Sequence, residues 1–245
     1  DENGLIIEAL AETLTQHHPA LIYTIPTFHN PTGINLSAAR RAELVALSEE
    51  YDFLIVADEV YQLLHYTNPP PPPMSHYNRA GTVLSLGTFS KIMAPGLRLG
   101  WIEARPRLLD RLLNSGQVDS GGGLNPFPAA MVHSALDLGL QDDYLAFLQR
   151  TYGERVRLMS AALRQHVPTY EFTEPDGGYF IWGRLPETIN TEAILPAVRA
   201  ENVGYLPGNR CAINQGFPNY LRLSFAYYPN QAIEEGVARL AKVIK

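Results

Sequence analysis

The stretch SLGTFSKIMAPGLRLGW, from Ser85 to Trp101, is the part of the sequence around which the rest of the chain is organised. An apolar run ends there in two hydroxyl side chains, a lysine follows, and an arginine comes seven residues later: Thr88, Ser90, Lys91 and Arg98. A lysine with a second cation nearby and partial desolvation becomes a usable amine for Schiff-base chemistry with an aldehyde. Hydroxyls and a planar guanidinium bind phosphate. The stretch therefore predicts a covalent lysine beside an anion site, although a short motif alone also fits a surface lysine after a strand.

The composition excludes several classes of protein. The net charge is −6 with a pI near 5.6, and no Lys/Arg-rich run marks a surface for nucleic acid. No apolar run approaches the roughly 20 residues of a membrane helix. Cys211 is the only cysteine, so no intrachain disulfide forms and a cytoplasmic, reducing compartment is expected. The chain starts at Asp1 within a turn-like DENG, and we expect an N-terminal part to be missing.

Helices and apolar strands alternate in the first half of the chain, which is typical of a parallel sheet with covering helices. Helical periodicity predicts helices over 5–17 and over 37–51, the latter capped by Ser37. We expect the second helix to bury Ala42, Val45 and Leu47 and to expose, among its charged residues, Arg40 and Arg41. Apolar runs predict buried strands at 20–26, 53–57, 82–87 and 99–104, and Pro106 is expected to begin a further helix.

The pattern changes in the second half. Helices are predicted at 127–138, 141–166 and 191–201 and at the C-terminus, and strands at 171–173, 179–182, 203–206 and 220–225. The helix at 141–166 is long enough to connect two domains. We therefore predict an α/β fold in which 1–145 form part of a larger, mainly parallel domain with flanking helices and 146–245 form a smaller α+β domain.

Two low-complexity segments carry weaker signals. Residues 68–74 contain five consecutive prolines, which form a stiff extended segment. A rigid loop inside the domain is the favoured interpretation, and a ligand for a proline-binding module is the alternative. Residues 120–126 hold three glycines without a following Gly-Lys-Ser/Thr, so a nucleotide P-loop is rejected.

Polar side chains follow several of the predicted strands: Asn30, Asp58, Tyr61, Thr88, Ser90 and Lys91. Ligands of open α/β sheets bind beyond the carboxyl ends of the strands, so these residues are expected at one rim. A carboxylate such as Asp58 stays ionised beside a protonated pyridine nitrogen. Taken singly, Asn30 could open a turn, Asp58 could cap a helix and Tyr61 could pack in the core.

Several motifs together resemble the class I/II aminotransferases, which are pyridoxal-phosphate enzymes of fold type I. The matching segments are NPTG at 30–33, ADEVY at 57–61, TFSK at 88–91, GLRLGW at 96–101 and YLRLSF at 220–225. The resemblance covers essentially the whole chain and is strongest to the subgroup of 2-aminoadipate and aromatic aminotransferases. It implies the fold type I large domain, followed by the smaller C-terminal domain.

The resemblance implies a role for each matching residue. Lys91 would be the Schiff-base lysine and the general base and acid of the proton shift, and Asp58 would pair with the ring nitrogen and keep it protonated. Arg222 would bind the substrate carboxylate, with Asn30 also at the substrate. The ring oxygen would be bound by Tyr61 and Asn30 and the phosphate by Thr88, Ser90 and Arg98, so that Lys91, Asp58 and Tyr61 form the catalytic set. Arg222 could instead form a structural salt bridge. No metal is expected.

The resemblance also implies the activity, which is transfer of an amino group from an α-amino acid to a 2-oxo acid by a ping-pong mechanism. A full-length homodimer is expected, with no nucleic-acid or membrane partner. The family's N-terminal region supplies a glycine-rich phosphate turn and an aromatic residue that stacks on the ring. We therefore expect this chain alone to bind the cofactor weakly and to turn over poorly.

Other functions are compatible with the same residues. A lyase acting at the β or γ carbon of an amino acid would use the same cofactor site. The effector-binding domain of a transcription regulator, or an inactive remnant, would need no catalysis. Regulators of that type often depart from NPTG, and the intact motif at 30–33 favours an enzyme. Tyr23 and Asn125 could line the site, or could serve core packing and a loop turn.

Overall fold

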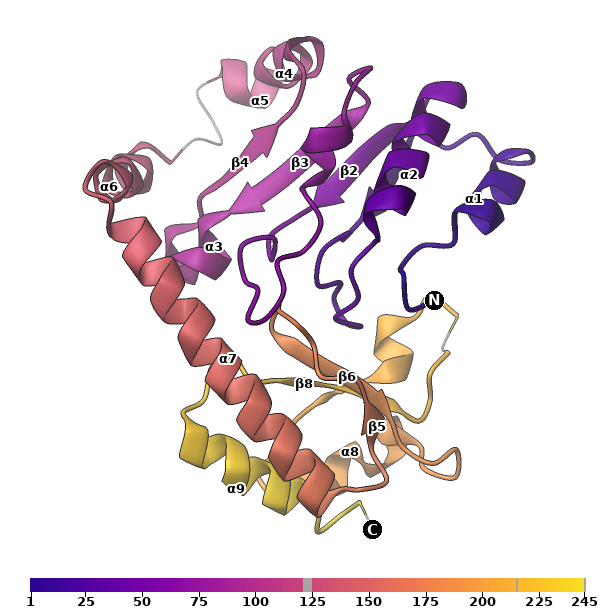
Figure 1. Cartoon of the computed structure of the whole chain (residues 1–245), viewed down its shortest axis with the longest axis vertical. Helices are drawn as coiled ribbons and strands as arrows, with labels where there is room; N and C mark the ends of the chain where they lie inside the picture. Colours follow the sequence, from indigo (N-terminus) through magenta and orange to yellow (C-terminus); the bar gives the residue numbers. More distant parts are fainter. Residues whose placement is uncertain (121–124, 215, 245) are drawn as a thin grey trace. The chain divides into compact units, whose positions relative to one another are not determined.

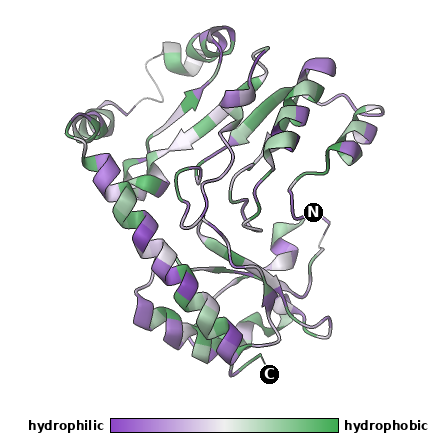
Figure 2. Ribbon diagram, in the orientation of Figure 1, coloured by the Kyte–Doolittle hydropathy of each residue, from purple (hydrophilic) through white to green (hydrophobic). Residues whose placement is uncertain are grey.

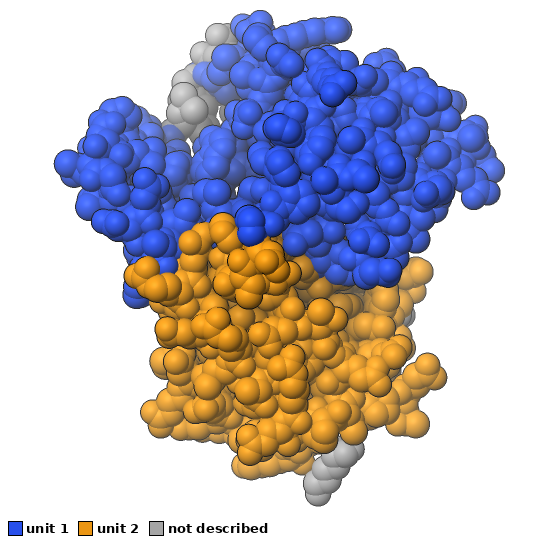
Figure 3. All heavy atoms as spheres, viewed as in Figure 1, with its two compact units in different colours: residues 1–27, 34–64, 69–148 blue, residues 28–33, 65–68, 149–245 orange. Residues whose placement is uncertain are grey.

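The computed structural model describes residues 1–120, 125–214 and 216–244; most of the glycine-rich segment, 121–124, lies outside them. The chain divides into two compact units, which Figure 3 shows in different colours. Unit 1 comprises residues 1–27, 34–64 and 69–148, and unit 2 comprises residues 28–33, 65–68 and 149–245.

Among the described residues, unit 1 is built on a four-stranded sheet with the order β1-β2-β3-β4. The strands are β1 (Leu21–Thr24), β2 (Leu54–Asp58), β3 (Val83–Thr88) and β4 (Gly100–Glu103), the last three of which Figure 1 labels. The first three strands are parallel, and β4 returns antiparallel to β3. All four lie where the sequence predicts strands, because each is a short apolar run between turns. The carboxyl ends of β1, β2 and β3 therefore share one edge of the sheet.

Helices cover the sheet of unit 1. Near the N-terminus, α1 (Ile7–Leu14) lies beside α2 (Ala38–Glu50), and Figure 2 shows apolar residues along β2. Their shared core includes Leu14, Leu44, Phe53, Ile55 and Val83, each almost fully buried. The other helical segments of the unit are η1 (Met74–Tyr77), α3 (Phe89–Ile92), η2 (Pro95–Leu97), α4 (Pro106–Leu113), α5 (Gly116–Asp119), α6 (Pro126–Asp137) and the start of α7 (Leu140–His166). None of the helices formed by the described residues has both the length and the apolar character needed to cross a bilayer.

The helix α2 differs from expectation in which face it buries. Ser37 caps it as predicted, accepting a hydrogen bond from the backbone N–H of Arg40. However, Arg41 is completely buried and Ala42 is exposed, so the predicted exposure of these two residues is wrong. The buried face runs through positions 41, 44, 45 and 48, which share one side of a helix. The arginine is buried because its guanidinium finds partners for every nitrogen.

The Arg41 guanidinium forms a hub behind the edge of the unit 1 sheet. Its Nη1 lies 3.4 Å from Oε1 of Glu59, which is also buried. Its remaining bonds go to one side-chain and three backbone oxygens: Leu36 O (2.9 Å), Pro26 O (2.8 Å), Thr27 Oγ1 (2.8 Å) and Pro72 O (3.0 Å). Burial of an ion pair is tolerated only when further hydrogen bonds satisfy both partners. The hub thus joins the end of β1, the start of α2 and the proline segment.

Glu59 completes this hub from the end of β2. Its carboxylate accepts the backbone N–H of Met74 at 2.9 Å and the hydroxyl proton of Ser85. Burial raises the pKa of Glu59, although these hydrogen bonds and the nearby Arg41 cation act in the opposite direction. Burial also lowers the pKa of Arg41. Gln62 Nε2 donates to Pro71 O at 2.8 Å. The five-proline segment is therefore bonded into unit 1, which supports its interpretation as an internal rigid loop.

Unit 2 contains an antiparallel sheet with the order β5-β6-β8-β7. Its strands are β5 (Glu171–Phe172), β6 (Phe180–Arg184), β7 (Leu206–Pro207) and β8 (Tyr220–Ser224), and its helical segments are the end of α7, α8 (Thr191–Ala200), η3 (Gly208–Cys211) and α9 (Asn230–Leu240). Figure 1 shows α7 and α9 side by side. One apolar cluster that includes Leu163, Ile181, Leu221 and Val237 forms the core.

Two short segments from the first half of the chain belong to unit 2. Phe28 is 1% exposed, and Gly178 packs against it so closely that a Cβ there would lie 2.9 Å from Phe28 Cβ. His65 forms a β-bridge with Gly177, and Tyr66 donates a hydrogen bond to Gly178 O. The units are therefore not two consecutive stretches of sequence, and a domain division near residue 145 stays a prediction.

We expect Arg41→Met to lower the free energy of unfolding by about 3–5 kcal/mol, because Glu59 would keep a buried charge without its cation. The measurement is chemical denaturation followed by circular dichroism. The control is Arg40→Met, which removes a more exposed ion pair with Asp1 from the same helix and should cost about 1 kcal/mol or less. Equal losses for the two variants would contradict the role of the hub. The double variant Arg41→Met/Glu59→Gln should cost less than the sum of its single changes.

His29 should make unit 2 sensitive to acid. Its ring Nδ1 lies 3.0 Å from Thr32 Oγ1, and burial lowers its pKa from the ordinary value of 6.5. A lowered folded-state pKa contributes stability that is present above pH 6.5 and is lost as the pH falls through the lowered value. We expect His29→Gln to lessen the loss of unfolding free energy between pH 7 and pH 5, measured by urea denaturation. His18→Gln, at an exposed position, should keep the wild-type pH profile; if His29→Gln keeps it too, this assignment is wrong.

Candidate functional site

Three predicted catalytic residues lie in unit 1 near the carboxyl edge of its sheet. Asp58 is the last residue of β2, and Tyr61 follows in the adjoining turn with its side chain buried. Lys91 is in α3, which begins directly after β3. Its Nζ lies 6.0 Å from the centroid of the Tyr61 ring. Parallel pairing of β2 with β3 sets Asp58 opposite Leu86, two residues before β3 ends, and so brings these groups to one edge.

The predicted phosphate ligands also meet in unit 1. Thr88 Oγ1 accepts the backbone N–H of Ser90 at 3.1 Å and donates its proton to Leu99 O at 3.2 Å. Arg98 Nη1 lies 3.4 Å from Ser90 Oγ and 3.2 Å from Pro95 O. The antiparallel return of β4 carries Arg98 back to the end of β3. Arg98 and Ser90 thus present a guanidinium and a hydroxyl together, whereas the Thr88 hydroxyl caps α3.

The return of β4 depends on a close approach between two residues of the opening motif. Gly87 on β3 is the cross-strand partner of Trp101 on β4. A Cβ at Gly87 would lie 2.0 Å from the Trp101 ring, so any other residue there would have to displace that ring. The Trp101 ring also packs on Phe89, with centroids 4.9 Å apart. These contacts fix the strand pair that holds Lys91 and Arg98.

Tyr23 is a residue whose role the sequence left open. It lies on β1, and its phenol donates a hydrogen bond to Asp58 Oδ2 at 2.5 Å. The pKa of Tyr23 is raised to about 12, mainly by partial burial and next by the hydrogen bond to Asp58. No described residue donates a hydrogen bond to the other oxygen, Asp58 Oδ1. Tyr23 therefore contacts the carboxylate directly instead of packing in the core.

The two predicted substrate ligands meet in unit 2, although they are far apart in sequence. Arg222 on β8 donates from Nη1 to Asn30 Oδ1 at 2.6 Å. Its guanidinium carbon lies 4.0 Å from the centroid of Phe180 on β6, within the range of a cation–π contact. Ring and amide together fix the orientation of the guanidinium plane. An arginine held in this way suits a planar carboxylate, which it binds through two parallel hydrogen bonds.

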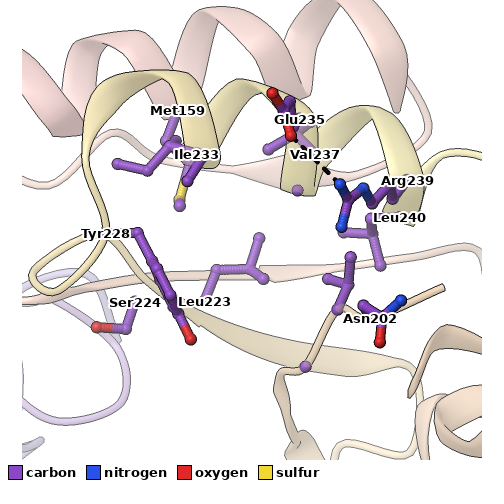
Figure 4. A pocket seen from close by; sticks show the side chains of 14 residues that line it. Met159, Asn202, Leu223, Ser224, Tyr228, Ile233, Glu235, Val237, Arg239 and Leu240 are labelled. Atoms are coloured by element: carbon purple, nitrogen blue, oxygen red, sulfur yellow. Dashed lines mark hydrogen bonds and ion pairs between the residues drawn. The ribbon is translucent and has the colours of Figure 1, made fainter. Parts of the chain in front are cut away.

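A pocket of about 230 Å³ lies elsewhere in unit 2, and Figure 4 shows it from close by. Leu223, Val237 and Leu240 of the unit's core line it, and the ion pair of Glu235 with Arg239 lies at its polar side. The described residues that line this pocket include none of the predicted site residues. Within the described part of the chain, no group of three or more His, Cys, Asp or Glu side chains is arranged to hold a metal ion.

The comparison with known proteins begins with the family. The profile of the family described as "Aminotransferase class I and II" matches residues 1–240. The chain is 36% identical to aromatic-amino-acid aminotransferase 1 of Thermococcus litoralis over its whole length and 60% of that protein. It is 30% identical to an uncharacterized HTH-type transcriptional regulator, YdfD, of Bacillus subtilis, over its whole length and 50% of the regulator.

The fold matches as well. The crystal structure of LysN, the alpha-aminoadipate aminotransferase of Thermus thermophilus complexed with N-(5'-phosphopyridoxyl)-L-leucine, aligns with a TM-score of 0.91 and 32% identity, over the whole chain and 63% of that enzyme. The chain thus spans between 50% and 63% of the length of these three proteins. The predicted fold type I architecture is confirmed. Because the family profile covers nearly the whole sequence, the chain belongs to the class I and II aminotransferases.

Proposed function

We propose that the chain is the part of a pyridoxal-phosphate-dependent aminotransferase that carries the cofactor lysine. The observation that carries this proposal is the meeting of Lys91, Asp58 and Tyr61 at one edge of the unit 1 sheet. The substrates would be an α-amino acid and a 2-oxo acid, used in alternate half-reactions. The names of the aromatic-amino-acid and alpha-aminoadipate relatives support this substrate class.

The side chains present fit pyridoxal 5'-phosphate by their chemistry. An aldehyde needs an amine, a basic ring nitrogen needs a carboxylate, and a phosphate needs cations and hydroxyls; unit 1 offers Lys91, Asp58 and the pair of Ser90 with Arg98. Asp58 Oδ2 is already bonded to Tyr23, which leaves Oδ1 for a cationic N–H. When bound, this cofactor supplies an electron sink that withdraws negative charge from the α-carbon of an amino acid.

The chain's own residues would perform the remaining tasks. The Lys91 amine would take the proton from the substrate α-carbon and would return a proton to the aldehyde-derived carbon of the cofactor, where the amino group is retained. Tyr61 and Asn30 would donate hydrogen bonds to the ring oxygen. Arg222, oriented by Phe180 and Asn30, would bind the substrate carboxylate.

The phosphate would be bound in unit 1 by the remaining three residues. Ser90 and Arg98 would contribute a hydroxyl and a guanidinium, and the 3.4 Å between Ser90 Oγ and Arg98 Nη1 supports this assignment. Thr88 would be the third phosphate ligand, although its hydroxyl donates its proton to Leu99 O in this structure. We further propose a cytoplasmic homodimer for the full-length protein, with no nucleic-acid partner, from the family resemblance.

The first test traps the cofactor on the chain. Of the three lysines, Lys91, Lys242 and Lys245, we expect borohydride reduction after incubation with millimolar pyridoxal phosphate to label Lys91 predominantly. Mass spectrometry of peptides measures the label, and borohydride captures even weak binding. Lys91→Ala should lose that label, whereas Lys242→Ala, which removes only an exposed ion pair with Glu201, should keep it. Equal labelling of all three lysines would overturn the assignment.

A product assay on the same protein separates the possible activities. An aminotransferase converts an α-amino acid to the 2-oxo acid and retains the amino group on the cofactor. A lyase would release a fragment from the β or γ carbon without an added oxo acid. An effector-binding domain would label at Lys91 and yield neither product.

The phosphate site gives a second prediction. Arg98→Met should weaken binding of pyridoxal phosphate about 10-fold, because hydrogen bonds to charged groups contribute about 1.5–3 kcal/mol and Arg98 is exposed to solvent. Binding of pyridoxal, which lacks the phosphate, should not change. Equilibrium dialysis measures both, with Arg107→Met on α4 as the matched exposed control. A parallel loss for pyridoxal would exclude a phosphate role for Arg98.

A further inference from the structure

The hydrogen bond from Tyr23 to Asp58 follows from the register of two neighbouring strands. Tyr23 is the direct partner of Val56 in the parallel pairing of β1 with β2. Side chains two residues apart on a strand share a face, so Asp58 lies on the same face as Val56. A tyrosine side chain is long enough to reach such a diagonal neighbour. The sheet itself therefore aims the phenol at the carboxylate.

The contact is specific for the polar end of the tyrosine. The residue is 56% exposed, and packing in the core does not explain its position. Its phenol and Asp58 Oδ2 are 2.5 Å apart, the short separation of a hydrogen bond to a charged acceptor. The pKa of about 12 keeps the phenol protonated throughout the neutral range, so that it acts as a donor.

A carboxylate at the partly exposed end of a strand, such as Asp58, would otherwise turn freely and bind water. A donor fixed on one oxygen restricts this rotation and leaves the other oxygen in a defined direction. When a side chain is already ordered before a ligand arrives, the entropy cost of ordering it no longer weakens binding. Tyr23 donates such a hydrogen bond to Asp58 Oδ2, whereas Asp58 Oδ1 accepts no hydrogen bond from any described residue.

We propose that Tyr23 is a positioning residue that holds Asp58 Oδ2 and so directs Oδ1 toward the ring nitrogen of the cofactor. This inference rests on the proposed function, since Asp58 would be the partner of that nitrogen. Tyr23 contacts neither the substrate nor the cofactor in this proposal. It acts only through the orientation and the charge of the carboxylate.

The hydrogen bond can be tested without any cofactor. In protein labelled with ¹³C at tyrosine Cζ, the resonance of Tyr23, assigned by its loss in Tyr23→Phe, should titrate near pH 12. In Asp58→Asn it should titrate at lower pH, because the nearby charge and its hydrogen bond no longer oppose ionisation. An unchanged titration in Asp58→Asn would overturn the proposal.

The consequence for the cofactor is tested with a pair of ligands. Tyr23→Phe should weaken binding of pyridoxal phosphate about 2- to 10-fold, the cost of ordering one side chain. Binding of the 1-deaza analogue, in which a carbon replaces the ring nitrogen, should not change. Equilibrium dialysis gives both constants, with Tyr144→Phe on α7 as the exposed control in the same unit.

Each outcome decides a separate question. Equal losses for both ligands would show that Tyr23 supports the fold in general, and unchanged binding of pyridoxal phosphate would show that it does not position Asp58; either result overturns the inference. If neither ligand binds the wild-type chain, the proposed function fails. The tyrosine titration would then still report whether the bond exists, so the two failures are distinguishable.

Discussion

The buried ion pair of Arg41 with Glu59 is the interaction on which the edge of the unit 1 sheet depends. Neither group could be buried alone, because the desolvation cost of a charge exceeds what a single hydrogen bond returns. Here the guanidinium bonds to five oxygens, and the carboxylate also accepts from Met74 and Ser85. The pair therefore ties the end of β1, the start of α2, the end of β2 and the proline segment into one body.

This hub explains how two consecutive acids can have different tasks. Successive residues at a strand end point to opposite faces. Glu59 points inward to Arg41, whereas Asp58 points to the face where Tyr23 meets it. The inner carboxylate fixes the backbone, and the outer one is then available for a ligand. Because the backbone at Asp58 is held from behind, a donor as simple as one phenol suffices to orient its side chain.

In unit 2, the side chain of an arginine is likewise held in one orientation by its neighbours. Arg222 is oriented by the ring of Phe180 on the adjacent strand and by the amide of Asn30, which lies in a segment from the first half of the chain. The burial of Phe28 anchors that segment to the unit. The guanidinium is thereby prearranged within unit 2, as the substrate role proposed for Arg222 requires.

The sequence by itself determined the order of the strands and of the longer helices, the family and the candidate residues, because apolar periodicity and the motifs NPTG, ADEVY and TFSK are local properties. The buried face of α2 could not be predicted in this way. An arginine such as Arg41 is expected at the surface, and it is buried here because oxygens from segments distant in the sequence surround it. The bonds of Asn30 to Arg222 and of Tyr23 to Asp58 likewise join residues 192 and 35 positions apart. Only the tertiary structure decided them, since strand register and packing set which side chains meet, and the roles assigned to the site residues stay predictions.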